Sequence, residues 1–193
     1  MSTVNELKTQ YDDIPYELIL MLNGVDAFTY NHSVRVCEMA QLVESELKLT
    51  GHALSEAGLL HDIGKYYISS NILQKRGKLT KLERNFIDAH AFFSYDTLCR
   101  FGMPHEICEI ALYHHTTTPY LFNVTLPACE DKHIVYLARI IKTIDIYEAI
   151  TSDRPYHRGL SEKTAAQCFE DDQIDHDPAV LEILMSNSKI TRE

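Results

Sequence analysis

Apolar residues recur every three or four positions along most of this 193-residue chain, which is the period of an α-helix with one buried face. The clearest stripe lies between Phe28 and Leu49, where apolar side chains fall at Val36, Ala40 and Val43. His32 lies one turn before Val36 and therefore shares that stripe. Strict alternation of apolar and polar residues, the sign of a half-buried strand, never persists beyond a few positions. The pattern therefore predicts helices and no β-sheet.

Start and stop signals divide this pattern into separate helices. Thr80 and Glu83 have the spacing of a capping box, and Pro104 suits the first turn of a helix. The expected helices run over 14–22, 28–49, 53–63 and about 133–150; one follows Thr80 and extends to Phe93, one runs from Pro104 to His114, and two begin at Ser161 and Asp177-Pro178. Loops are expected over 66–79 and 116–131. These elements predict an all-α fold, a single-domain bundle of seven to nine helices.

Composition and charge limit the class of protein. Hydrophobic residues make up 45% of the chain and charged residues 24%, as in an ordinary soluble globular protein. The formal net charge of −10 argues against a surface for a nucleic acid polymer. The apolar stretch Leu18–Leu22 is far too short to cross a bilayer, and no signal-peptide pattern precedes it. We therefore expect no membrane segment and no nucleic-acid partner.

The five cysteines indicate a reducing compartment. They are odd in number, scattered along the chain, and form no CxxC pair. We expect reduced thiols that mostly occupy small core positions, in a protein of the cytoplasm.

Histidine and aspartate residues on the apolar stripes are the candidate functional residues. A single histidine on such a face is more often a hydrogen-bonded core residue than a metal ligand. Here, however, one such residue or pair falls on each of several predicted helices: His32, the pair His61-Asp62, His90, the pair His114-His115, and Asp145. Neutral imidazoles and carboxylates together suit iron, manganese, nickel or zinc. The sequence therefore predicts a metal site assembled from several helices.

With their flanking residues, these positions resemble the HD superfamily of metal-dependent phosphohydrolases, and within it the HD-GYP cyclic-dinucleotide phosphodiesterases. The matching segments follow the order of that family: His32 with Arg35-Val36, Leu59–Lys65, Ile72-Leu73, Lys78–Thr80, His90, His114-His115, Ala138–Ile140 and Asp145–Tyr156. The last segment is more similar to the HD-GYP branch than to other HD hydrolases. The resemblance implies a phosphohydrolase domain over 28–165, a helical N-terminal extension over 1–27, and a helical C-terminal extension over 166–193 packed on the same domain.

The resemblance also implies a centre of two divalent ions, iron or manganese by preference, with nickel and zinc as alternatives. One ion would be held by His32, His61, Asp62 and Asp145. Asp62 would bridge to the second ion, whose other ligands would be His90, His114 and His115. Lys65 would lie beside the bridging water and the substrate phosphate, and Arg154 would contact another phosphate oxygen. In this assignment Asp62 and Lys65 are the catalytic residues.

Two departures from the family pattern affect these expectations. Members with a third metal carry a glutamate one turn before the first histidine, where this chain has Phe28. The Gly-Tyr-Pro segment is absent, because Thr116–Tyr120 and an unrelated loop to Asp131 follow His114-His115. We therefore expect two metals, and weak or altered activity on cyclic di-GMP.

The function predicted by the resemblance is hydrolysis of a cyclic dinucleotide or related small phosphate ester by a water that two metals activate. One alternative is a non-hydrolytic signalling module that keeps its metals and binds a nucleotide or a partner protein. Another is an HD-type di-iron oxygenase. The sequence leaves open whether the chain forms a homodimer.

Overall fold

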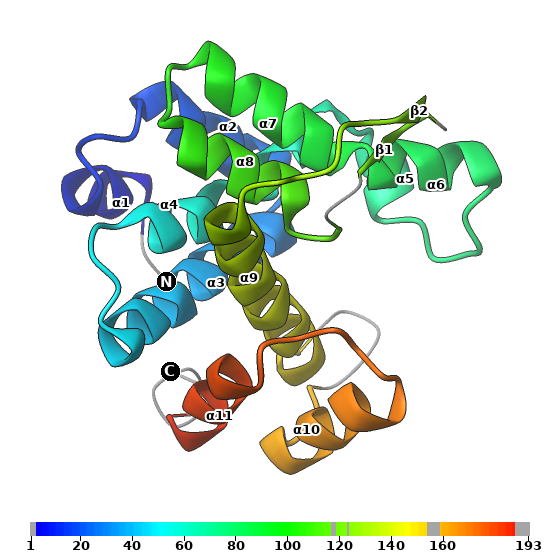
Figure 1. Ribbon diagram of the computed structural model, residues 1–193. Helices are drawn as coiled ribbons and strands as arrows, with labels where there is room; N and C mark the ends of the chain where they lie inside the picture. Colours follow the sequence, from blue (N-terminus) through cyan, green and yellow to red (C-terminus); the bar gives the residue numbers. More distant parts are fainter. Residues whose placement is uncertain (1–2, 117–118, 123, 154–158, 188–193) are drawn as a thin grey trace.

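The computed structural model describes residues 3–116, 119–122, 124–153 and 159–187, and nearly all of its regular structure is helical (Figure 1). The predicted all-α class is confirmed. The helices are α1 (Val4–Gln10), α2 (Tyr16–Val25), α3 (Ala27–Leu47), α4 (Ala53–Leu60), the 3₁₀ helix η1 (Ile63–Tyr67), α5 (Ser70–Leu73), α6 (Lys81–Asp88), α7 (His90–Arg100), α8 (His105–Tyr113), α9 (Lys132–Thr151), α10 (Glu162–Asp171) and α11 (Pro178–Ser186).

The structure divides the chain more finely than the sequence pattern does. Its described parts contain eleven α-helices, against the seven to nine predicted. The short helices α1 and α5 add to the number, and the helix expected to run from Thr80 to Phe93 is broken at Ala89. Ala89 ends α6 and begins α7, and it is fully buried. The break follows from tertiary packing, because α7 leaves the direction of α6 to lie against η1.

The segment expected to be a loop over 116–131 contains a small β-hairpin. Strands β1 (Tyr120–Leu121) and β2 (Val124–Thr125) pair antiparallel, with Leu121 opposite Val124. Strands of two residues are too short to produce an alternating pattern, so the sequence could not reveal them. The hairpin lies beside α6 at one side of the molecule (Figure 1).

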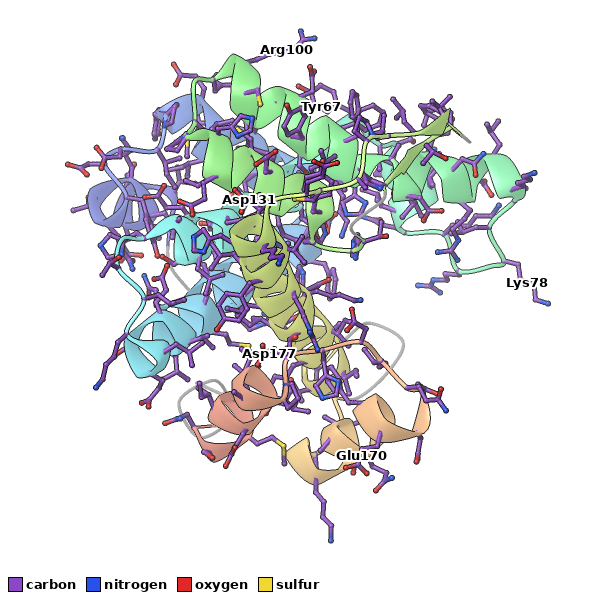
Figure 2. The ribbon with its side chains drawn as sticks, viewed as in Figure 1. Tyr67, Lys78, Arg100, Asp131, Glu170 and Asp177 are labelled. Carbon is purple, nitrogen blue, oxygen red and sulfur yellow. The ribbon has the colours of Figure 1, made fainter. Side chains whose placement is uncertain are left out.

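The main core lies where α3 and α9 pack against each other and against α4 and α8. The predicted stripe of α3 is confirmed, since Val36, Ala40 and Val43 are fully buried. Charged side chains such as Lys78 and Arg100 instead project from the surface (Figure 2). Among the described residues, no helix combines the length and apolar character needed to cross a bilayer.

The two C-terminal helices begin where the sequence predicts. The Ser161 side chain accepts the Thr164 N–H, and the Asp177 carboxylate accepts the N–H groups of Ala179 and Val180. Both helices pack on α9, at the end away from α7 and α8 (Figure 1).

The close approach of η1 to α7 requires glycine at position 64. A side-chain carbon added to Gly64 would lie 2.5 Å from the backbone nitrogen of Ser94, 2.8 Å from Phe93 Cβ, and closer still to the His90 carbonyl oxygen. The Gly64 N–H also donates to Ser94 Oγ at 2.9 Å. This contact brings the end of the His61-Asp62 segment beside the first turn of α7.

Gly64→Ala is therefore expected to lower the free energy of unfolding by about 2 kcal/mol or more, because rigid backbone atoms must move to admit the methyl group. Urea unfolding measures the change. Gly77→Ala is the matched control, since an added carbon there meets no atom within 4 Å. Equal stability of the two variants would contradict the packing argument.

Candidate metal centre

Seven side chains that the sequence singled out converge from five segments of the chain. They form three groups, and within each group the ligand atoms lie within 4.8 Å of one another. The groups overlap because they share His61 and His114, and they are His90, His114 and His115; His32, His61 and Asp62; and His61, His114 and Asp145. His32 comes from α3 and Asp145 from α9, whereas the other five lie at helix ends. Helices that are distant in the sequence therefore place these polar side chains together in one cluster.

Three of the imidazoles are oriented in the same way. In His61, His90 and His114, Nδ1 lies 2.8, 2.5 and 2.7 Å from the backbone carbonyl oxygen three residues earlier, so Nδ1 carries the proton and donates. Burial lowers the pKa of His90 to about 4 and holds the pKa of His114 well below its usual range. In His90 and His114, a neutral ring with protonated Nδ1 leaves Nε2 with a free lone pair, which is the form that binds metal.

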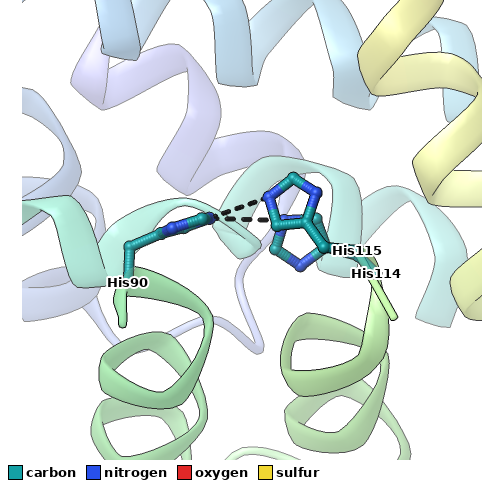
Figure 3. Close-up of side chains that lie close together, drawn as sticks. All are labelled: His90, His114 and His115. Carbon is teal, nitrogen blue, oxygen red and sulfur yellow. Dashed lines mark hydrogen bonds between the residues drawn. The ribbon is translucent and has the colours of Figure 1, made fainter. Parts of the chain in front are cut away.

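These lone pairs face one another inside the protein. His90 Nε2 lies 3.4 Å from His114 Nε2 and 3.1 Å from His115 Nε2 (Figure 3). His61 Nε2 is buried and has no hydrogen-bond partner in the described part of the chain. Facing lone pairs and an unpartnered buried nitrogen are costly on their own, but they are stabilised when a cation lies between them. The donor set therefore fits a divalent metal.

Asp62 has the geometry of a bridge. Its Oδ1 lies 3.2 Å from His90 Nε2, whereas its Oδ2 lies 3.6 Å from His32 Nε2 and 3.5 Å from His61 Nε2. The carboxylate is almost fully buried, yet the charge of Lys65 and the nearby histidines hold its pKa well below the usual range against the effect of burial. Asp62 is therefore ionised, with one oxygen directed to each side of the centre.

Glu148 and Arg35 support the centre, although the sequence argument gave them no role. Glu148 is fully buried on α9, where its Oε2 is hydrogen-bonded to His32 Nδ1 and its Oε1 accepts from Arg35 Nε at 2.5 Å. Burial alone would lower the pKa of His32, but Asp145 and Glu148 raise it to about 9. The Glu148 carboxylate thus fixes the His32 ring so that its Nε2 points toward Asp145 Oδ1, 3.0 Å away. One signal was present: Glu148 follows Asp145 by one helical turn.

A cavity of about 670 Å³ opens onto the centre. Lys65 lines it, with Nζ 2.5 Å from Asp62 Oδ2. Phe28, at the position of the third-metal glutamate, stacks in parallel on the His32 ring with centroids 6.5 Å apart. Phe28 thus presents an apolar ring to the cavity in place of a metal ligand. Arg154, the other predicted phosphate contact, lies outside the described residues.

Comparison with models of protein families shows the family to which this chain belongs. The profile of the HD domain matches residues 29–150, a span that includes all seven predicted metal ligands. The chain belongs to the HD domain family. The resemblance inferred from the sequence is therefore confirmed at the level of this family.

The relatives of this HD domain act on cyclic dinucleotides according to their names. The chain is 34% identical over 170 residues to a cyclic di-GMP phosphodiesterase of Pseudomonas aeruginosa, covering 84% of this chain and 40% of that protein. It is 36% identical over 163 residues to 3'3'-cGAMP-specific phosphodiesterase 1 of Vibrio cholerae, covering 81% and 37%. The chain therefore spans about two fifths of the length of these relatives.

A solved structure shares the fold. The HD domain of the L. monocytogenes phosphodiesterase PgpH, in complex with cyclic-di-AMP, matches with a TM-score of 0.60 and 20% identity, covering 88% of this chain and 91% of that one. This likeness supports the helical HD architecture.

Proposed function

We propose that this HD domain is a metal-dependent phosphodiesterase that hydrolyses a cyclic dinucleotide or a closely related phosphate diester. The observation that carries the proposal is the bridging position of Asp62 between two groups of histidines, beside Lys65, which lines the adjoining cavity. The names of the relatives favour a cyclic dinucleotide over other diesters.

Two divalent ions, iron or manganese by preference, fit the donors. His32, His61 and Asp145 would hold one ion, and His90, His114 and His115 the other, with Asp62 shared. Such ions supply an activated water and neutralise charge on the phosphoryl group. The chain has no need of a nucleophilic serine or cysteine in this scheme.

Lys65 would act on the substrate directly. Its ammonium group has three donors and is held at the wall of the cavity by Asp62, so it can donate to a phosphoryl oxygen as negative charge develops there. Glu148 would act through His32, by fixing the direction of Nε2. The apolar rings of Phe28 and Phe122 line the same cavity and reduce the access of bulk water to the reacting phosphate.

The experiment that tests this function uses protein purified without chelator and supplied with manganese, or with ferrous iron under anaerobic conditions. Turnover is measured on bis(p-nitrophenyl) phosphate and on cyclic di-GMP, 3'3'-cGAMP and cyclic di-AMP. We expect hydrolysis of the simple diester and of at least one cyclic dinucleotide, with cyclic di-GMP not the best substrate because the Gly-Tyr-Pro segment is absent.

Treatment with chelator should abolish the activity, and added manganese should restore it. Protein that holds both metals and binds a cyclic dinucleotide without cleaving it would instead favour the non-hydrolytic signalling module. Rapid cleavage of cyclic di-GMP at micromolar concentration would contradict the altered specificity but leave the phosphodiesterase assignment intact.

A further inference from the structure

The cavity extends beyond the metal centre to a second wall formed by α6. Arg84, Asn85 and Asp88 line this wall, whereas the metal ligands and Lys65 come from other elements. The cavity volume of about 670 Å³ lies within the range of pockets that enclose a whole small-molecule ligand, roughly 300–1,000 Å³. The space available is thus larger than one reacting phosphate requires.

We propose that Arg84 forms a second phosphate subsite, which holds the phosphate of a cyclic dinucleotide that does not react. This inference rests on the proposed phosphodiesterase function and specifies how its substrate is recognised. It assigns a binding role to a residue that lies outside the metal centre.

The charge on Arg84 is available to a ligand. Within the described part of the chain its guanidinium forms no hydrogen bond or ion pair, although Asp88 lies one turn later on the same helix. The neighbouring Glu83 is already occupied, because it accepts from Lys75 Nζ at 2.6 Å and from the Thr80 N–H at 2.7 Å. Arg84 therefore presents to the cavity a planar cation that no described carboxylate pairs with, and that shape suits two-point contact with a phosphate.

Lys65 is in a different electrostatic position. Its ammonium group is paired with Asp62 at the metal centre. The cavity thus has one cation beside the reacting position and another on the α6 wall. A cyclic dinucleotide carries two phosphodiester groups in one ring, whereas a simple diester carries one. Only the cyclic dinucleotide can contact both cations at once.

The hairpin fixes the α6 wall in place. The ring of Phe122 packs edge-on against Phe86 of α6, with centroids 5.1 Å apart, and lies 6.5 Å from the ring of Phe93 on α7. Phe122 adopts a left-handed backbone conformation with φ of 47°, which is unfavourable for a residue other than glycine. The aromatic contacts offset that cost and hold Phe122 at the wall of the cavity. Phe122 as a whole remains 40% exposed and lines the cavity, so its ring can stack on a nucleobase beside Arg84.

The test compares Arg84→Ala and Arg84→Lys with wild type. We expect Arg84→Ala to raise KM for the best cyclic dinucleotide about tenfold or more, with kcat changed by no more than about twofold, because the lost contact is made equally in ground and transition states. Kinetics on bis(p-nitrophenyl) phosphate should remain at the wild-type level. Arg84→Lys should recover part of the affinity, since lysine keeps the charge without the planar fork.

Arg100→Ala is the matched control. Arg100 also lies on a helix surface, where it pairs with Asp96 at 2.8 Å and projects away from the body of the protein (Figure 2). Arg100→Ala removes the same charge from the chain as Arg84→Ala does, and it should leave KM for both substrates unchanged. A KM increase equal to that of Arg84→Ala would mean that net charge, and not a subsite, sets the affinity.

A binding measurement separates this inference from the proposed function. Calorimetry with a slowly hydrolysed phosphorothioate analogue of the cyclic dinucleotide should show affinity about tenfold weaker in manganese-loaded Arg84→Ala. If wild type binds the analogue but hydrolyses no diester, the phosphodiesterase function fails, and the affinity of Arg84→Ala still decides the subsite. The subsite would be overturned if Arg84→Ala bound the analogue as tightly as wild type, or if wild type did not bind it. It would also be overturned if Arg84→Ala raised KM equally for the cyclic dinucleotide and for bis(p-nitrophenyl) phosphate.

Discussion

Asp62→Ala is expected to deprive the protein of both metal ions. The two oxygens of Asp62 face different groups of histidines, at 3.2 Å from His90 Nε2 and 3.5 Å from His61 Nε2, so its loss removes a ligand from each ion. Elemental analysis of protein purified without chelator should fall from about two equivalents to well below one. Circular dichroism on the same samples reports whether the helices persist.

His90→Ala separates the two ions. His90 contacts His114 and His115 on one side of the centre, so this variant should lose mainly one equivalent. His133→Ala is the control, because His133 is exposed and pairs with Glu106 outside the centre. Retention of both ions by Asp62→Ala, or the loss of both by His90→Ala in folded protein, would be incompatible with a bridging carboxylate.

Lys65→Ala should leave the metal content nearly unchanged and reduce turnover about 100- to 1,000-fold, the range seen when a donor to a developing oxyanion is removed. The reason is position: Lys65 lines the cavity and its Nζ lies beside Asp62. Turnover of bis(p-nitrophenyl) phosphate and metal content are measured on the same preparation. Lys78→Ala, in an exposed loop, should behave as wild type. Wild-type activity of the Lys65 variant would show that the phosphate does not bind beside this ammonium group.

The sequence predicted most of the fold because most of its signals are local. The apolar stripe of α3 and the caps at Ser161 and Asp177 depend only on neighbours along the chain, and the structure has them as expected. The break at Ala89 was not predictable in this way. Both α6 and α7 keep a helical period, and the close approach of Gly64 to α7 joins residues that are far apart in the sequence.

The candidate site shows the same difference between residues that local sequence signals reveal and residues whose roles depend on tertiary packing. The metal-ligand residues stand out because a polar ring on an apolar stripe is costly without a partner, and His61 Nε2 is the plainest instance of that cost. Glu148 was missed because its function depends on how α3 and α9 cross, which places it against His32 and Arg35. Arg84 was missed because a single charged residue on an exposed helix has no distinguishing pattern until the cavity beside it is known.

Anomalous scattering from crystals of protein purified without chelator tests the central claim most directly, since it reports the number, place and element of the ions together. The account predicts two peaks, about 4 Å apart, one beside His32 and His61 and the other beside His90, His114 and His115, with Asp62 between them. A single peak, an empty centre, or a third peak beside Phe28 would contradict it.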